Sequence, residues 1–142
     1  MNEQKNVELT QQIFKAFGEG NIQFLLNLLA EDVEWQVAGS PEHTPLSGEY
    51  HGVEQVAHIF KTVSEFLQIQ QFQPQEFVAQ DDRVVVFGYA VGRILSTNRP
   101  VEYDWVHLYT FNNGKISKFR EYLDTAAIAT ALGDTNSLFS AS

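Results

Sequence analysis

Apolar residues along the first half of the chain recur mostly at helical spacing. From about Asn6 to Phe17 they recur every three or four residues, which predicts a helix that ends at the following glycines. Asn21 can cap a second, shorter helix, and a third helix is predicted from about Val53 to Leu67. Between these two, apolar and polar residues alternate from Val33 to Val37, which indicates a half-buried strand. The stretch 38–52 is rich in Gly, Pro and Ser and is predicted to be a loop.

The second half of the chain is predicted to be mostly strand. The predicted strands are 69–80, 84–94, 101–111 and 116–123. Pro74 predicts that the first of them is an edge strand or carries a bulge, because proline cannot donate a ladder hydrogen bond. Gly88 and Gly92 predict a bend or close packing in the second. Asn112-Asn113-Gly114 predicts a hairpin turn before the last.

The order of these elements predicts the fold class. Asp124 or Thr125 can cap a final short helix that ends near Leu132, and the tail from Asp134 is expected to be loose. Three helices with one interrupting strand therefore precede a run of antiparallel strands. Helices gathered on one face of such a sheet make an α+β fold. The 142 residues contain no internal repeat or linker, so a single domain is expected.

The composition argues against several kinds of site and partner. The chain has no cysteine, which excludes disulfides and a cysteine nucleophile and suits a reducing, cytoplasmic compartment. A formal net charge of -9 disfavours nucleic acid and anionic lipid as partners. The polar N-terminus lacks the apolar run of a signal peptide, and no segment has the ~18 apolar residues that span a bilayer. We therefore expect neither a nucleic-acid partner nor a membrane.

Two groups of residues carry a resemblance to a known family. The first is Ala30–Trp35 (AEDVEW), followed by Gly48-x-Tyr50-x-Gly52 and a helix. The second is Trp105–Ile116 (WVHLYTFNNGKI), followed by Arg120–Asp124 (REYLD). This pattern resembles the SnoaL-like polyketide cyclases and ketosteroid isomerases of the nuclear transport factor 2-like superfamily, over about residues 7–132.

The resemblance implies a cone-shaped fold around a pocket. A curved antiparallel or mixed sheet would be wrapped by three N-terminal helices, and the pocket would open at one end and hold a small apolar ligand without a cofactor. The alternating aromatic face around His107 supports a pocket independently, because small-molecule sites combine apolar walls with few polar groups. The resemblance also implies a homodimer through the outer sheet face. An apolar patch of Val106, Leu108 and Ile116 is expected there.

His107 and Glu121 are the leading catalytic candidates. The resemblance places His107 where ketosteroid isomerases hold an oxyanion-hole aspartic acid, and Glu121 near the catalytic aspartate of SnoaL-type cyclases. A three-residue turn pairs Phe111 with Lys115, so His107 is predicted opposite Phe119, with Glu121 diagonally within reach. The alternatives are a core histidine bonded to a carbonyl group and a solvated glutamate outside the pocket.

Further candidates surround this pair. Asp124 is a third catalytic candidate, with capping of the last helix as its alternative role. The candidates for substrate contact, with plain core packing as the alternative for the aromatic ones, are Trp35, Val37, Tyr50, Trp105, Tyr109, Phe119, Phe14 and Phe17. Tyr50 lies in the predicted loop, where it could form a lid.

Two positions argue against steroid isomerisation. The resemblance places Phe14 and Phe17 in the helix region that carries an oxyanion-hole tyrosine in ketosteroid isomerases, and phenylalanine has no hydroxyl. It places Val37 at or near their proton-shuttling aspartate, and valine cannot accept a proton. His43, His51 and His58 form no convincing set of metal ligands, so no metal is expected.

Two functions remain open from the sequence. The first is a cofactor-independent enzyme that moves a proton on a small apolar carbonyl compound by cyclisation, isomerisation or dehydration. His107 would hold the substrate oxygen and Glu121 would shuttle the proton, or the roles would be reversed. The second is a non-catalytic binding module that holds a hydrophobic small molecule or a partner segment in the same pocket.

Overall fold

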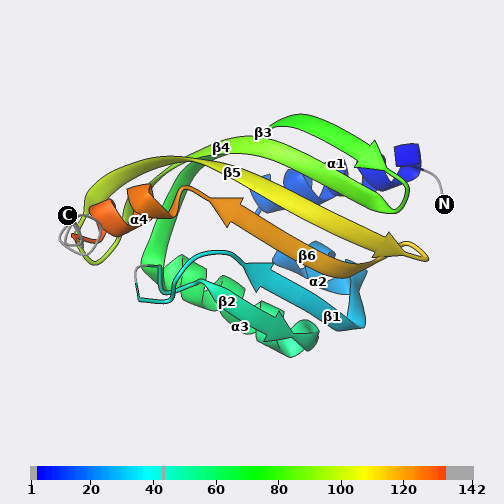
Figure 1. Cartoon of the computed structure of the whole chain (residues 1–142), viewed down its shortest axis with the longest axis horizontal. Helices are drawn as coiled ribbons and strands as arrows, with labels where there is room; N and C mark the ends of the chain where they lie inside the picture. The colour runs from blue at the N-terminus through cyan, green and yellow to red at the C-terminus, as the bar shows by residue number, and fades with distance from the viewer. Residues whose placement is uncertain (1–2, 43, 134–142) are drawn as a thin grey trace.

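The computed structural model describes residues 3–42 and 44–133, so His43 and the predicted tail lie outside the described residues. Its helices are α1 (Glu3–Gly18), α2 (Ile22–Leu28), α3 (Gly52–Phe66) and α4 (Thr125–Ala131). Its strands are β1 (Leu29–Val37), β2 (Gly48–His51), β3 (Leu67–Gln80), β4 (Arg83–Ile94), β5 (Arg99–Asn112) and β6 (Lys115–Leu123). The strands form one sheet in the order β2-β1-β6-β5-β4-β3 (Figure 1). The predicted α+β fold is confirmed.

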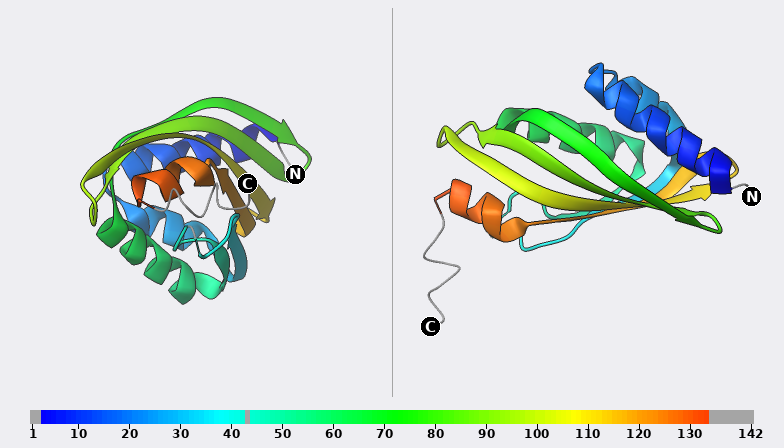
Figure 2. Two further views of the ribbon diagram at one scale, coloured as in Figure 1. Left: turned by 60° about the vertical axis from the view of Figure 1, so that its left-hand side comes forward. Right: turned by 90° about the horizontal axis from the view of Figure 1, so that it is seen from above.

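The long strands bend across the molecule and the helices lie on their concave side (Figures 1 and 2). β1 runs parallel to β6, and the other paired strands in the described chain are antiparallel, so the sheet is mixed. The apolar face of α1 packs against β3 and β4, while α3 packs against β1 and β2. The helices thus cover the inner face of the sheet, and their apolar side chains meet its inward-facing residues.

Two helices begin directly after the predicted capping residues. The Asn21 side chain accepts a hydrogen bond from the backbone N–H of Phe24 at 3.2 Å, at the start of α2. The Asp124 carboxylate accepts one from Ala127 N–H at 3.1 Å, at the start of α4. Both bonds satisfy a backbone donor that the first helical turn leaves unpaired.

One strand lies where only a loop is predicted. β2 occupies part of the stretch 38–52 and pairs antiparallel with β1, with Trp35 opposite Tyr50. The prediction of a continuous loop is therefore wrong. β2 has four residues and no buried side chain, so its own sequence carries little strand signal, and its pairing with β1 provides the backbone hydrogen bonds.

Pro74 and Gly88 have the structural consequences that the sequence predicts. β3 is an edge strand, and its pairing with β4 is irregular near Ile69 and again next to Pro74. A Cβ atom on Gly88 would lie only 2.1 Å from the ring of Trp105 on β5. Gly88 therefore allows the indole to lie flat against the backbone of β4, which is the close packing expected there.

The β5–β6 hairpin corrects the predicted pairing. Its turn has two residues, because Asn112 pairs with Lys115, and Asn113 and Gly114 have the positive φ of a tight hairpin turn. A bulge one residue beyond Ile116 then shifts the register, so that His107 lies directly opposite Glu121 and not opposite Phe119. The predicted register is wrong by two residues. An even shift leaves both side chains on the face that was predicted for them.

The outer face of the sheet differs from expectation at one residue. Val106 and Leu108 are half-buried on this face, as expected, but Ile116 is fully buried in the core, on the inner side next to the hairpin turn. The prediction for Ile116 is wrong because the two-residue turn reverses its direction relative to the predicted loop. Phe87 and Tyr122 lie opposite Val106 on the neighbouring strands and are 41% and 45% exposed.

Among residues 3–42 and 44–133, no helix is long and apolar enough to cross a bilayer.

Candidate active site

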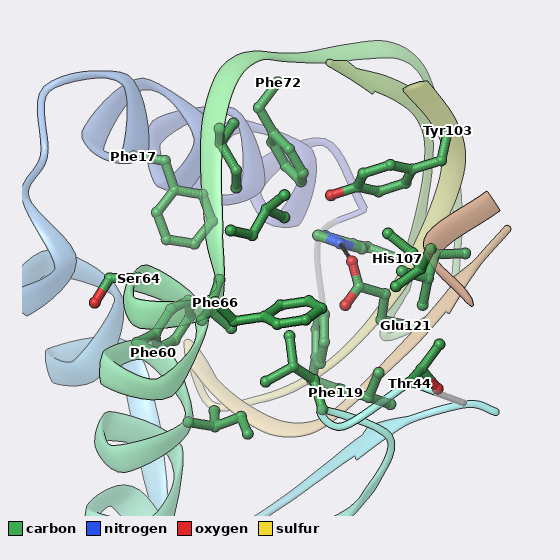
Figure 3. Close-up of a pocket in the computed structure, with 18 of the residues that line it drawn as sticks. Phe17, Thr44, Phe60, Ser64, Phe66, Phe72, Tyr103, His107, Phe119 and Glu121 are labelled. Atoms are coloured by element: carbon green, nitrogen blue, oxygen red, sulfur yellow. Dashed lines mark hydrogen bonds and ion pairs between the residues drawn. The ribbon is translucent and has the colours of Figure 1, made fainter. Parts of the chain in front are cut away.

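The inner face of the sheet and the surrounding helices enclose a cavity of about 560 Å³. This volume is in the range of small-molecule sites. Aromatic side chains from both sheet and helices form much of its wall (Figure 3), and they include Phe14, Phe17, Trp35, Phe60, Phe66, Phe72, Tyr103, Tyr109 and Phe119.

His107 and Glu121 form a hydrogen-bonded pair on this wall. The distance from His107 Nε2 to Glu121 Oε2 is 2.9 Å, and the register of β5 and β6 places the two residues face to face (Figure 3). The His107 side chain is only 6% exposed, whereas that of Glu121 is 21% exposed. The carboxylate is therefore the member of the pair that is more open to the cavity.

Both ring nitrogens of His107 have partners. Nδ1 lies 3.1 Å from the hydroxyl of Tyr109, two residues along β5 on the same face. Burial, and next the charge of Glu121, raise the pKa of Tyr109 well above its ordinary value, so this phenol keeps its proton. With the imidazole neutral, the Tyr109 O–H donates to Nδ1 and Nε2–H donates to the Glu121 carboxylate. The three side chains form a chain of hydrogen bonds that ends at Glu121.

Aromatic rings hold the histidine in place. The ring centroid of His107 lies 4.3 Å from that of Trp105 and 4.8 Å from that of Phe119. On the neighbouring wall, Trp35 stacks on Phe119 with 3.7 Å between ring centroids. The titratable pair therefore lies in a rigid, largely apolar surrounding in which electrostatic interactions are stronger than in water.

Most of the candidate residues lie on the cavity wall. The cavity-lining candidates are His107, Glu121, Phe14, Phe17, Trp35, Val37, Tyr109 and Phe119. Trp105, Tyr50 and Asp124 are not among the lining residues.

These three exceptions have distinct physical reasons. Trp105 is 1% exposed and lies behind Phe72, whose ring stacks on the indole at 4.4 Å. Tyr50 is half-buried on β2, and its hydroxyl donates to the carbonyl oxygen of Leu46 at 2.9 Å, so it supports the loop before β2 instead of closing the cavity. Asp124 is exposed and caps α4. The structure thus favours the alternative roles of packing for Trp105 and capping for Asp124.

Several lining residues are not among those that the sequence predicts. Tyr103 is 6% exposed and continues the inward alternation of β5 by one more step, so the same pattern could have identified it. Burial, and next the charge of Glu121, raise its pKa. Thr44 and Ser47 come from the loop before β2, where they are hydrogen-bonded to each other, and no periodic signal marks them.

No group of three or more side chains suited to hold a metal ion occurs in the part of the chain that the structure describes.

The chain is similar to proteins of one family over most of its length. The SnoaL-like domain family matches residues 10–119. An NTF2-like protein from Burkholderia xenovorans LB400 is 42% identical, over 92% of this chain and 98% of that one, with a TM-score of 0.81. TerC, co-crystallised with polyporic acid, is 27% identical over 90% of this chain and 98% of its own, with a TM-score of 0.80.

An NTF2-like protein of unknown function from Burkholderia pseudomallei K96243 is 25% identical, over 92% of this chain and 98% of that one, with a TM-score of 0.82. No curated protein matches the chain at a significant level.

Proposed function

The chain belongs to the SnoaL-like domain family, and from this premise we propose that it is a cofactor-independent enzyme that moves a proton on a small apolar carbonyl compound. The observation that carries the proposal is the hydrogen bond between His107 and Glu121 in an aromatic cavity. A carboxylate next to a carbonyl compound can remove a proton from the carbon beside the carbonyl group. TerC, a relative co-crystallised with polyporic acid, supports a small molecule as the occupant of this cavity.

We assign the proton transfer to Glu121. Its carboxylate takes the proton from the substrate carbon, the electron pair moves onto the carbonyl oxygen, and the protonated carboxyl group then returns the proton to another position of the same molecule. The atoms balance without a co-reactant. Cyclisation, isomerisation and dehydration all have such a step in common.

The hydrogen bonds favour a supporting role for His107. Both of its ring nitrogens already have protein partners, Tyr109 and Glu121, so a bond to the substrate oxygen would require one of these to break. His107 instead orients the carboxylate through its Nε2–H group. The three groups act as a unit, and removing any one changes the others.

Deuterium exchange tests this proposal without a known product. In D2O, wild-type protein is expected to speed the incorporation of deuterium beside the carbonyl group of 2-tetralone, measured by NMR. Glu121→Gln and His107→Ala should each reduce the enzyme-catalysed rate by about 10²-fold or more, the usual size of a general acid–base contribution. The double variant should be little slower than Glu121→Gln alone, because residues that act as a unit are not additive.

The matched control is Glu8→Gln, which makes the same chemical change at an exposed position of α1 and should keep the wild-type rate. Equal rates in wild type and Glu121→Gln contradict the proposal. Binding of 2-tetralone without any catalysed exchange favours the non-catalytic binding module instead.

A further inference from the structure

A proton-transfer site of this kind needs a second group besides the base. As the proton leaves the substrate carbon, negative charge develops on the carbonyl oxygen, and a hydrogen-bond donor must stabilise it. The cavity-facing residues of α1 cannot supply a donor, because Phe14 and Phe17 have no hydroxyl. The donor must therefore come from another part of the wall.

Most polar groups on the wall are already occupied. The Tyr109 hydroxyl is bonded to His107, and the Ser64 hydroxyl donates to the carbonyl oxygen of Lys61 at 2.6 Å. Thr44 and Ser47 are bonded to each other and to backbone carbonyl groups of their own loop. Each of these donors would have to give up an existing bond to reach a ligand.

The hydroxyl of Tyr103 differs from all of these. Tyr103 lies on the inner face of β5, is 6% exposed, and has no hydrogen-bond partner for its hydroxyl among residues 3–42 and 44–133. Figure 3 shows this hydroxyl pointing into the cavity, toward His107 and Glu121. Because this hydroxyl reaches the cavity and no protein group occupies it, it can donate to a ligand oxygen without first giving up a bond.

The fully buried polar side-chain atoms that have no partner in the described chain do not compete for this role. They are the Nε1 atom of Trp105 and the side-chain amide atoms of Asn6, and neither residue lines the cavity. Gln70 does line it but is exposed, so water can satisfy its amide.

Tyr103 is also in the right protonation state to donate. Burial raises the pKa of this phenol, and the negative charge of Glu121 raises it further. The O–H group therefore persists at neutral pH. Tyr103 and Glu121 both line the cavity, so one ligand can contact both side chains.

We propose that the Tyr103 hydroxyl donates a hydrogen bond to the carbonyl oxygen of the substrate while the Glu121 carboxylate acts on the neighbouring carbon. Tyr103 then replaces the donor that α1 lacks. This inference rests on the proposed proton-transfer function, and it adds that the substrate is oriented with its oxygen toward β5.

Binding of a matched pair of probes tests Tyr103 separately from turnover. The probes are 2-tetralone, whose oxygen only accepts hydrogen bonds, and tetralin, which has the same rings and no oxygen. Tyr103→Phe should weaken binding of 2-tetralone about 3- to 10-fold, the effect of one neutral hydrogen bond, and leave binding of tetralin nearly unchanged. The infrared carbonyl band of bound 2-tetralone should move to higher frequency in this variant, because its hydrogen bond is lost.

The control is Tyr122→Phe, which removes a hydroxyl from the opposite, outer face of the sheet and should change neither affinity. Equal effects of Tyr103→Phe on the two probes, or an unchanged carbonyl band, overturn the assignment. Turnover gives an independent result, since Tyr103→Phe should reduce deuterium exchange by about 10²-fold, the usual effect of losing one oxyanion donor. Absence of exchange in wild type overturns the proposed function, whereas the probe affinities decide the role of Tyr103 in either case.

Discussion

At the level of residues, hydrogen bonding inside the cavity decides what each polar side chain can do. His107 is almost fully buried and uses both nitrogens, so it is fixed in one orientation. Glu121 uses one carboxylate oxygen for His107 and is the more exposed of the two. This difference, and not the identity of the residues alone, separates a base that faces the ligand from a group that positions it.

The two tryptophans lie in different layers of the wall. Trp35 borders the cavity and stacks on Phe119, whereas Trp105 is covered by Phe72 and Phe14. A ligand can therefore touch the first indole but not the second.

Tryptophan fluorescence should report this layering. On binding 2-tetralone, the wild-type emission is expected to change, and Trp35→Phe should remove most of that change while Trp105→Phe retains it. Each variant is compared with its own ligand-free spectrum, so different starting intensities do not matter. A ligand response that survives in Trp35→Phe and disappears in Trp105→Phe would show that Trp105 is the indole that the ligand contacts.

At the level of elements, Gly88 on β4 and Trp105 on β5 depend on each other. The indole occupies the space where any other residue at position 88 would place its Cβ atom. The contact is with a rigid ring on a neighbouring strand, so the overlap cannot be relieved by rotating a flexible side chain.

Gly88→Ala is expected to destabilise the protein by about 1–3 kcal/mol, the usual cost of overpacking a core. Urea unfolding followed by circular dichroism measures this loss. In a Trp105→Leu background, where no indole opposes the new methyl group, the same substitution should cost much less. An equal loss in both backgrounds would mean that the indole is not the obstacle.

The sequence predicts which face of a helix or strand is buried better than it predicts how deeply a side chain is buried or which residues pair between strands. Periodicity identifies α1 and α3, and the caps Asn21 and Asp124 mark two helix starts, because these signals are local. Alternation along β5 predicts which residues face inward. It cannot tell that Trp105 lies behind another ring, because depth is set by side chains from α1 and β3.

The hairpin shows the same limit for the candidate site. The Asn-Asn-Gly signal locates the turn between β5 and β6, but the length of the turn and the bulge after Ile116 depend on how β6 packs against β1 and the core. The error in register was even, so the prediction that His107 and Glu121 share the inner face agrees with the structure, although the predicted partner residue was wrong.

At the level of the whole molecule, the outer face of the sheet carries an apolar row across three strands. Phe87, Val106 and Tyr122 lie side by side on β4, β5 and β6. Val78 on β3 adds to this surface and is 47% exposed. Contiguous apolar surface of this kind on a small domain favours association.

We therefore expect a homodimer through this face. Light scattering at micromolar concentration should give about twice the chain mass of 16.1 kDa. Phe87→Lys, which places a charge in the middle of the row at a position that the fold of one chain leaves exposed, should shift the mass toward the monomer without loss of circular dichroism. A monomer mass for the wild type would contradict the prediction.

The irregular pairing of the edge strand β3 hinders uncontrolled self-assembly of the protein. Its sequence, LQIQQFQPQEFVAQ, is rich in glutamine and apolar residues, and segments of that kind stack readily into fibrils. Unpaired backbone groups along a sheet edge offer a template for further strands. Pro74 removes one N–H group, and the two breaks in pairing interrupt the rest, so an incoming chain finds only short runs of regular backbone. The regular segments of β3 that remain are therefore too short to serve as a template for a growing fibril.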